Sequence, residues 1–130
     1  MIKRPNAAGL ILCRDTSVEE GTRNVTLFKA FNRLTPGAFP TPPLRFTVCT
    51  VLTDGLGDMR LTLTVDRPDT LETIYFYSWH ESFTDPLRDT RFLIRVPSCR
   101  FPIPGRYLIS LAADNEWVAQ CSLTLHPKGG

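Results

Sequence analysis

The sequence has no long run of apolar residues and little net charge. No run approaches the roughly 18 to 20 residues that a membrane-spanning helix needs. Fifteen Lys and Arg stand against 13 Asp and Glu in 130 residues, a formal net charge of +2. So small a charge gives no reason to expect binding to nucleic acid or to a membrane. A short alternating segment, not an apolar core, follows the basic residues 1–5, so we expect no secretion signal and a cytoplasmic location.

Motifs of catalysis and of phosphate binding are also missing. There are only two histidines, and His80 precedes Glu81 on a segment predicted to be extended, where neighbouring side chains point in opposite directions. No serine stands in a Gly-x-Ser-x-Gly context, and no lysine follows Gly55-Leu56-Gly57 as a phosphate-binding loop requires. We therefore predict a protein that is not an enzyme and has no cofactor.

The cysteines do not form the Cys-x-x-Cys pairs of a zinc ribbon. We expect reduced and mostly buried thiols that pack as small apolar side chains, as is usual in a reducing compartment. The alternative is a disulfide between Cys49 and Cys121 across two sheets, which needs an oxidising compartment. The two remaining cysteines are Cys13 and Cys99.

Turn-forming residues are plentiful, with 11 Pro and 8 Gly, and apolar and polar residues alternate between them. Such alternation is typical of strands with one buried face. The clearest strand pair covers residues 107–113 and 117–125, joined by a tight turn at Asp114-Asn115-Glu116, because Asp and Asn tolerate a positive φ. The core residues expected from this hairpin are Tyr107, Ile109, Leu111, Cys121 and Leu123.

Six further segments are predicted to be strands, and residues 35–43, with four prolines, are predicted to connect the sheets. A short helical turn is predicted at residues 82–88. About eight short strands separated by turns indicate a single domain over residues 1–130, an all-β, antiparallel two-sheet sandwich of the immunoglobulin-like type. The six strands are residues 7–14, 24–31, 44–53, 59–65, 71–79 and 91–96.

One predicted strand, residues 71–79, carries large apolar side chains on both faces. Tyr75, Tyr77 and Trp79 share one of them. If the strand lies at a sheet edge, this aromatic row is a candidate interaction surface, because Tyr and Trp are enriched in binding hot spots. The alternative is that a neighbouring loop covers the row.

Alternate loops of an antiparallel sandwich lie at the same end, and one end then collects ten of the 13 acidic residues. Carboxylates from neighbouring loops are what Ca²⁺ requires, so a calcium site is one interpretation. An acidic end that orients a basic partner is a second, and solvated loops without a specific role are a third. The candidate residues are Asp54, Asp58, Asp85, Asp89, Asp114 and Glu116.

Several short motifs occur in a recognisable order. They are Cys13-Arg14-Asp15 at the end of the first strand, residues 24–28, the proline-rich residues 39–43, and Pro104-Gly105-Arg106-Tyr107. In this order the sequence resembles, over nearly its whole length, a family of small uncharacterised bacterial proteins known only as a domain of unknown function. The resemblance implies an immunoglobulin-like sandwich from a bacterial cytoplasm, and it implies no activity.

These observations favour a non-catalytic module for protein interaction or self-association, with an unknown protein partner. The surface expected to act is the aromatic row or an exposed strand edge. A calcium- or ligand-binding sandwich that uses the acidic loops is the alternative.

Overall fold

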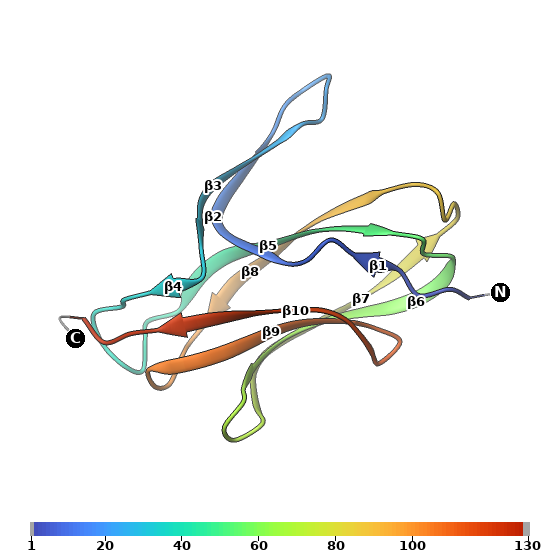
Figure 1. The fold of residues 1–130 in the computed structure, drawn as a ribbon. Coiled ribbons are helices and arrows are strands. Elements are labelled where there is room, and N and C mark those ends of the chain that lie inside the picture. Colours follow the sequence, from blue (N-terminus) through green and yellow to red (C-terminus); the bar gives the residue numbers. More distant parts are fainter. Residues whose placement is uncertain (1, 129–130) are drawn as a thin grey trace.

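A computed structural model describes residues 2–128 as a sandwich of ten strands in two sheets (Figure 1). Within that range no helix occurs, so the predicted all-β sandwich is confirmed. The first sheet contains β1 (Asn6–Ala7), β2 (Ile11–Val18), β3 (Val25–Phe31), β5 (Leu44–Thr53) and β8 (Thr90–Cys99). The second contains β4 (Arg33–Leu34), β6 (Gly57–Arg67), β7 (Glu72–Phe83), β9 (Gly105–Ala113) and β10 (Glu116–Leu125).

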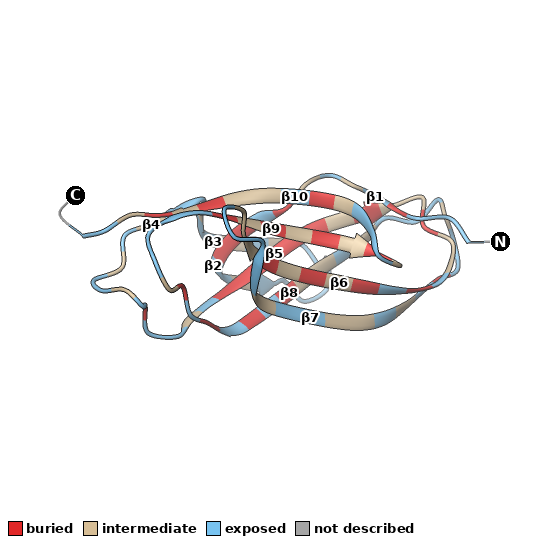
Figure 2. Ribbon diagram, turned by 90° about the horizontal axis from the view of Figure 1, so that it is seen from below, coloured by how far each residue is buried: buried red, intermediate tan, exposed pale blue. Residues whose placement is uncertain are grey.

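The strand order leaves β7 and β8 as outer strands. The second sheet runs β4-β10-β9-β6-β7, antiparallel throughout except for the parallel pair β4 and β10. In the first sheet β5 is central, with β8 on one side, β1 and β2 on the other, and β3 paired to β2. Trp79 of β7 and Phe92 of β8 are in contact, with ring centroids 6.1 Å apart, so the two outer strands share one flank of the sandwich (Figure 2).

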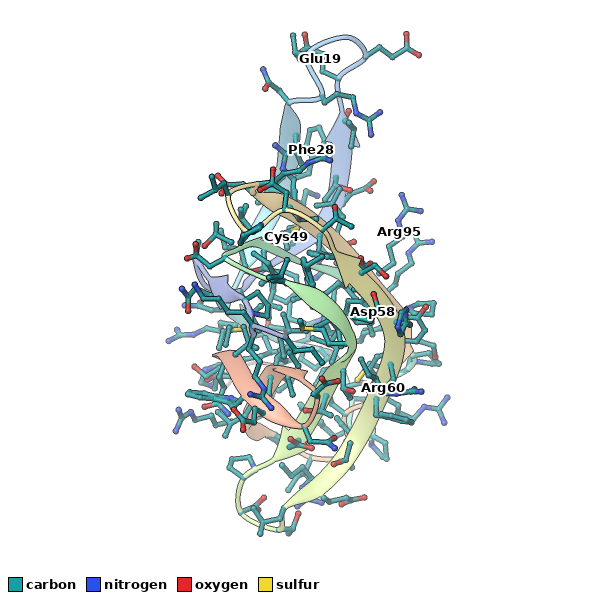
Figure 3. All side chains as sticks on the ribbon, turned by 90° about the vertical axis from the view of Figure 1, so that its right-hand side faces the viewer. Glu19, Phe28, Cys49, Asp58, Arg60 and Arg95 are labelled. Carbon is teal, nitrogen blue, oxygen red and sulfur yellow. The ribbon has the colours of Figure 1, made fainter. Side chains whose placement is uncertain are left out.

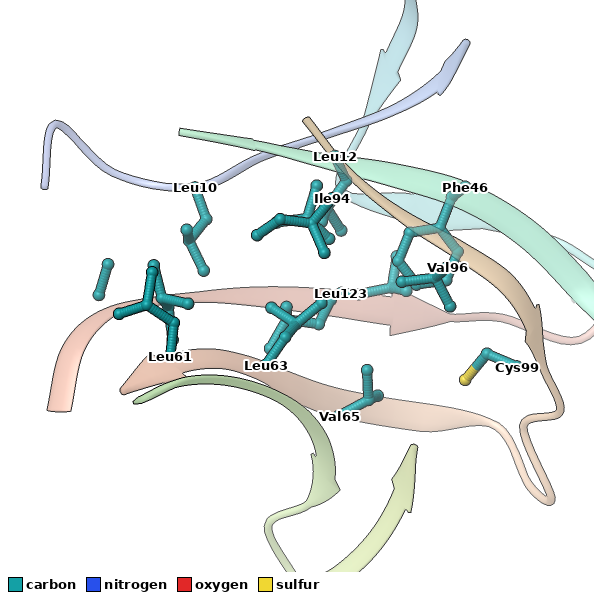
Figure 4. Close-up of a cluster of buried hydrophobic side chains, with 14 of the residues drawn as sticks. Leu10, Leu12, Phe46, Leu61, Leu63, Val65, Ile94, Val96, Cys99 and Leu123 are labelled. Atoms are coloured by element: carbon teal, nitrogen blue, oxygen red, sulfur yellow. The ribbon is translucent and has the colours of Figure 1, made fainter. Parts of the chain in front are cut away.

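The core lies between the sheets and follows the two-residue period of the strands (Figures 2 and 4). Along β6 every second side chain is buried, and the ones between them are half-buried or exposed. Four of the five core residues expected from the final hairpin are at most 1% exposed, which confirms them: Tyr107, Ile109, Leu111 and Leu123. Cys121 is half-buried beside the core, so that expectation is only partly met.

The predicted opening strand is in fact two strands. Gly9 has a φ of 116° and interrupts the pairing with β5, where its carbonyl accepts a hydrogen bond from the Thr50 hydroxyl at 2.6 Å. β4 is another two-residue strand, which pairs with β10 just before the proline-rich connection. These two short strands, β1 and β4, raise the count from the predicted eight to ten.

β2 and β3 extend past β5 as a two-stranded ribbon, which we call the arm (residues 14–29; Figure 1). The strand predicted at residues 7–14 therefore ended four residues too early. β2 continues to Val18 because its backbone stays paired with β3, for example Thr16 with Leu27, after β5 has diverged.

β7 is also longer than predicted, and there is no helical turn at residues 82–88. Its pairing with β6 continues to Phe83, which is 8% exposed and packs into the core. Residues 85–88 then form a tight turn, closed by a hydrogen bond from the Arg88 N–H to the Asp85 carbonyl at 3.2 Å. The burial of Phe83 is thus what holds this segment in the sheet.

The final hairpin turns at Asp114 and Asn115, with φ of 49° and 67°, as the sequence predicts. Trp117, however, does not follow the alternation of the rest of β10. The register with β9 shifts between Trp117 and Ala119, so Val118 is an extra residue in a bulge. The bulge reverses the alternation, and Trp117 is 64% exposed instead of sharing a buried face with Ala119.

Candidate functional site

The aromatic row of Tyr75, Tyr77 and Trp79 lies on β7, at the flank shared with β8. Pairing with β6 places the row opposite the buried leucines and valine of that strand, so it faces the other sheet. The two rings of Tyr77 and Trp79 stack, with centroids 5.6 Å apart and planes inclined by 23°. The first sheet does not extend far enough to cover the row, and Tyr77 remains 49% exposed.

Between β7 and β8 the row opens into a lateral cleft of about 400 Å³. Trp79 packs against Phe92 of β8, which belongs to the other sheet. Its indole N–H donates to Glu81 at 3.2 Å, which fixes the ring in the cleft. The cleft is lined by Tyr77, Trp79, Phe92, Leu93, Ile94 and Arg95.

The β7 edge beside this cleft is open, since no strand within residues 2–128 pairs with it. On the face of β7 turned away from the core, Phe76 is 64% exposed. His80 and Glu81 follow one another in this strand, so their side chains point to opposite faces, as predicted. The flank therefore offers exposed aromatic surface and unpaired backbone groups in one place.

Three of the loops predicted to form the acidic end lie together at one end of the sandwich (Figure 1). They are the β5–β6, β7–β8 and β9–β10 loops, and the Asp54 N–H donates to the Pro86 carbonyl at 3.0 Å between two of them. The tip of the arm lies away from this end. Asp58 belongs to β6 and not to a loop, because β6 begins at Gly57.

Most carboxylates at this end accept hydrogen bonds, each from a different donor. Asp58 accepts a hydrogen bond from the Ser82 hydroxyl at 2.6 Å, and Asp114 accepts one from the Arg60 backbone N–H at 2.9 Å. Asp54 accepts from Asn6 at 3.0 Å, Asp85 accepts from the Leu87 N–H at 3.0 Å, and Asp89 is exposed. Across the part of the chain that the structure describes, no three His, Cys, Asp or Glu residues are grouped as metal ligands.

The N-terminal segment contributes positive charge to this end, which the sequence did not reveal. Arg4 forms an ion pair with Glu116 at 3.2 Å and donates to the Ala113 carbonyl at 3.3 Å. Lys3 and Leu56 form an isolated antiparallel bridge. The only sequence signal was the basic Lys3-Arg4 pair itself, which says nothing of where the segment packs.

All four cysteines are free thiols, and three of them are buried. The alternative disulfide between Cys49 and Cys121 was wrong. Cys49 lies on the outer face of the first sheet, while Cys121 belongs to β10 of the second. The sulfur beside Cys49 is that of Cys13, 3.6 Å away.

Burial raises the pKa of Cys49 and Cys99 to about 12 and that of Cys121 to about 11, and it also raises the pKa of Tyr75 and Tyr107. These groups stay protonated in the native state but ionise near 9.0 (Cys) and 10.0 (Tyr) once unfolded. Their contribution to stability is therefore complete below pH 9 and is lost as the pH rises toward 12.

We expect the urea midpoint of unfolding to be constant from about pH 7 to 8.5 and to fall steadily above about pH 9. Unfolding curves at three or four alkaline pH values measure this directly. Cys99→Ala removes one raised pKa and should flatten the decline. A midpoint that stays constant to about pH 11 would contradict the expectation.

Residues 9–126 match a family whose description reads "Family of unknown function (DUF6941)". The chain belongs to this family. The DUF6941 match covers every strand except β1, and it includes the lateral cleft and all four cysteines. No curated protein matches the chain. None of the described residues forms a helix long and apolar enough to cross a membrane.

Proposed function

We propose that this member of DUF6941 is a non-catalytic self-association module in which β7 of one copy pairs with β7 of a second copy. The observation that carries the proposal is the open edge of β7 beside exposed Phe76 and Tyr77. An open edge presents a row of unpaired N–H and C=O groups, which bind another strand. Aromatic side chains next to it add apolar contact area.

The other long edges carry features that block pairing. β8 carries Arg91, Arg95 and Pro97, and charged side chains and proline are the usual means by which proteins protect a sheet edge. β3 bends at Lys29, which has a φ of 54°. In contrast, residues 75–83 of β7 contain no Pro, Lys or Arg and pair regularly with β6.

A two-fold axis at Ser78 gives the β7 edge a self-complementary register. Antiparallel pairing about this residue sets Tyr77 opposite Trp79 of the second copy, and Phe76 opposite His80. Aromatic pairs across two strands stabilise a sheet, each by roughly 0.2–1 kcal/mol. The small Ser78 side chains meet at the axis without crowding. A second copy therefore fits this edge better than a strand of arbitrary sequence.

Ser78→Lys is expected to weaken self-association at least tenfold, which corresponds to about 1.4 kcal/mol. Two lysines would face each other across the axis, where Cβ atoms are only about 4.5–5.5 Å apart, and like charges so placed repel. Sedimentation equilibrium or light scattering after gel filtration, over a range of protein concentrations, gives the monomer–dimer constant.

Leu87→Lys is the matched control, because it adds the same charge on a side chain that is 89% exposed and outside β7. It should leave the constant unchanged. Phe76→Lys tests the same edge through an exposed side chain, should Ser78→Lys disturb the fold. Either a wild-type chain that is monomeric at high concentration, or edge variants that dimerise like the wild type, would refute the proposal.

We further propose that the sandwich is immunoglobulin-like. Three features support this: the order β10-β9-β6-β7, which matches the G-F-C-C′ order of variable-type domains, the packing of β2, β5 and β8 as A, B and E, and Tyr107 near the start of β9. The Tyr107 hydroxyl donates to the carbonyl of Ile103 at 2.6 Å, as in a tyrosine corner. An experimental structure with another strand order would contradict this assignment.

A cytoplasmic location completes the proposal. Its support is the set of four free thiols, three of them buried, which fits a reducing compartment. Alkylation of thiols in intact native cells, followed by mass measurement, should find all four cysteines reduced. A disulfide that involves Cys99 or Cys121 in the untreated cell would argue against this compartment.

A further inference from the structure

Two thiols from neighbouring strands touch on the outer face of the first sheet. The Sγ atoms of Cys13 and Cys49 are 3.6 Å apart. Cys13 is paired in register with Thr47, and Cys49 with Ile11, so the two cysteines are diagonal neighbours on adjacent strands. A disulfide needs its sulfurs at about 2.05 Å, roughly 1.5 Å closer than these two.

The pair stands where the arm leaves the sandwich. β2 is paired with β5 only from Ile11 to Cys13, and beyond that point it continues with β3 alone. Cys13 is therefore the last residue of β2 that β5 holds, and the pair marks the base of the arm. A bond between these sulfurs would fasten the base of the arm to the centre of the first sheet.

Cys49 is the member of the pair that solvent reaches. It is 6% exposed, while Cys13 is fully buried, and it lines a groove of about 410 Å³. Val25 and Leu27 of the arm form one side of this groove, and Leu93 of β8 contributes to the other. Figure 3 shows the arm, with Glu19 and Phe28, rising above Cys49.

A hydrogen bond connects the arm with β8 beside this groove. The Arg91 guanidinium of β8 donates to the Arg23 carbonyl near the tip of the arm at 2.8 Å, which ties the arm to the sheet. The groove is large enough for a small oxidant, and its lining includes Cys49 but neither Cys99 nor Cys121.

We propose that Cys13 and Cys49 are a redox modification site at which a hydroperoxide converts the two thiols to a reversible disulfide. The Cys49 sulfur attacks the O–O bond and takes one oxygen as a sulfenic acid, and the other oxygen leaves as water or an alcohol. The Cys13 sulfur then attacks the Cys49 sulfur, the S–O bond breaks, and water leaves with the Cys13 proton. The thiols lose two electrons, and the hydroperoxide gains them.

This reaction is slow at neutral pH, because the thiolate is the nucleophile and burial raises the pKa of Cys49 to about 12. Cys13 from β2 contacts Cys49, and the positively charged Arg91 from β8 lines the same groove. The rate should therefore rise about tenfold for each unit of pH between about 7 and 9. The site responds to sustained oxidation and does not act as a fast peroxide scavenger.

Peptide mapping of the oxidised full-length chain tests the proposal. The reduced protein is incubated with about 1 mM hydrogen peroxide, the remaining thiols are alkylated, and the chain is digested with trypsin without reductant. The expected product links the tryptic peptides 4–14 and 46–60, and dithiothreitol separates them. A link between other cysteines, or Cys49 recovered as a sulfinic acid beside a free Cys13 thiol, would overturn the proposal.

Substitutions of single cysteines and the melting temperature of the oxidised protein test the proposal independently. Cys13→Ser should stop at a sulfenic acid on Cys49 that dimedone traps, and Cys49→Ser should prevent oxidation of Cys13. Cys121→Ser, which alters a thiol of the other sheet, should leave the link intact.

The oxidised wild type should melt roughly 5–10 °C higher than the reduced protein, because the bond closes the loop between residues 13 and 49. An unchanged melting temperature would contradict fastening of the arm. None of these outcomes depends on pairing through β7.

Discussion

Phe46→Ala is expected to destabilise the protein by about 3–5 kcal/mol and to lower its melting temperature by more than about 10 °C. Phe46 is 1% exposed and projects from β5 into the space between the sheets (Figure 4). Its ring also meets Phe31 edge to face, with centroids 6.1 Å apart. The substitution removes this contact and leaves a cavity that the two sheets cannot close without strain.

Phe28→Ala is the matched control for this experiment. Phe28 lies on the arm and is 47% exposed, so the same truncation there should cost less than about 1 kcal/mol. Urea unfolding followed by tryptophan fluorescence measures both variants. If the two substitutions cost the same, Phe46 does not occupy the core as described.

Tyr107→Phe is expected to cost about 2 kcal/mol, although it removes a single oxygen atom. Tyr107 is 1% exposed and packs edge to face on Phe101, with centroids 4.9 Å apart. Its hydroxyl donates to the Ile103 carbonyl at 2.6 Å and accepts from the Ile103 N–H at 3.3 Å. Phenylalanine would keep the packing but leave both backbone groups without this partner.

Tyr77→Phe removes the same atom from a half-exposed side chain and should change stability by less than about 0.5 kcal/mol. The comparison separates the loss of a buried hydrogen bond from a general effect of the hydroxyl. Thermal or urea unfolding of both variants measures the two losses of stability. Equal losses at the two positions would mean that the connection before β9 does not depend on the Tyr107 hydroxyl.

Local pattern predicted the central strands well. β5 was predicted with its observed bounds, and the turn at Asp114 and Asn115 has the positive φ angles that these residues tolerate. The face of the strand on which each side chain lies was predicted less well. One extra residue in a strand reverses every side chain beyond it, which is why Trp117 is exposed, and no residue pattern marked the bulge at Val118.

The candidate sites depended on which strands became neighbours. The aromatic row was predicted as a surface, but only the position of β8 determines that Trp79 is covered and Tyr77 is not. Three of the acidic loops gather at one end, but Arg4 and several hydroxyl and amide donors bind their carboxylates. The contact of Cys13 with Cys49 joins residues 36 positions apart and had no signal in their spacing.

The sequence by itself determined the class of fold, because alternation of apolar and polar residues with frequent turns is sufficient to form short strands that must bury one face. It also determined the tight final turn, since the backbone preferences of Asp and Asn act locally. Only the tertiary structure decided that β2 leaves β5 at Cys13, that β7 keeps an open edge, and that two thiols meet at the base of the arm. Each of these depends on pairing between distant segments, which is governed by the packing of the whole sandwich and not by neighbours in the chain.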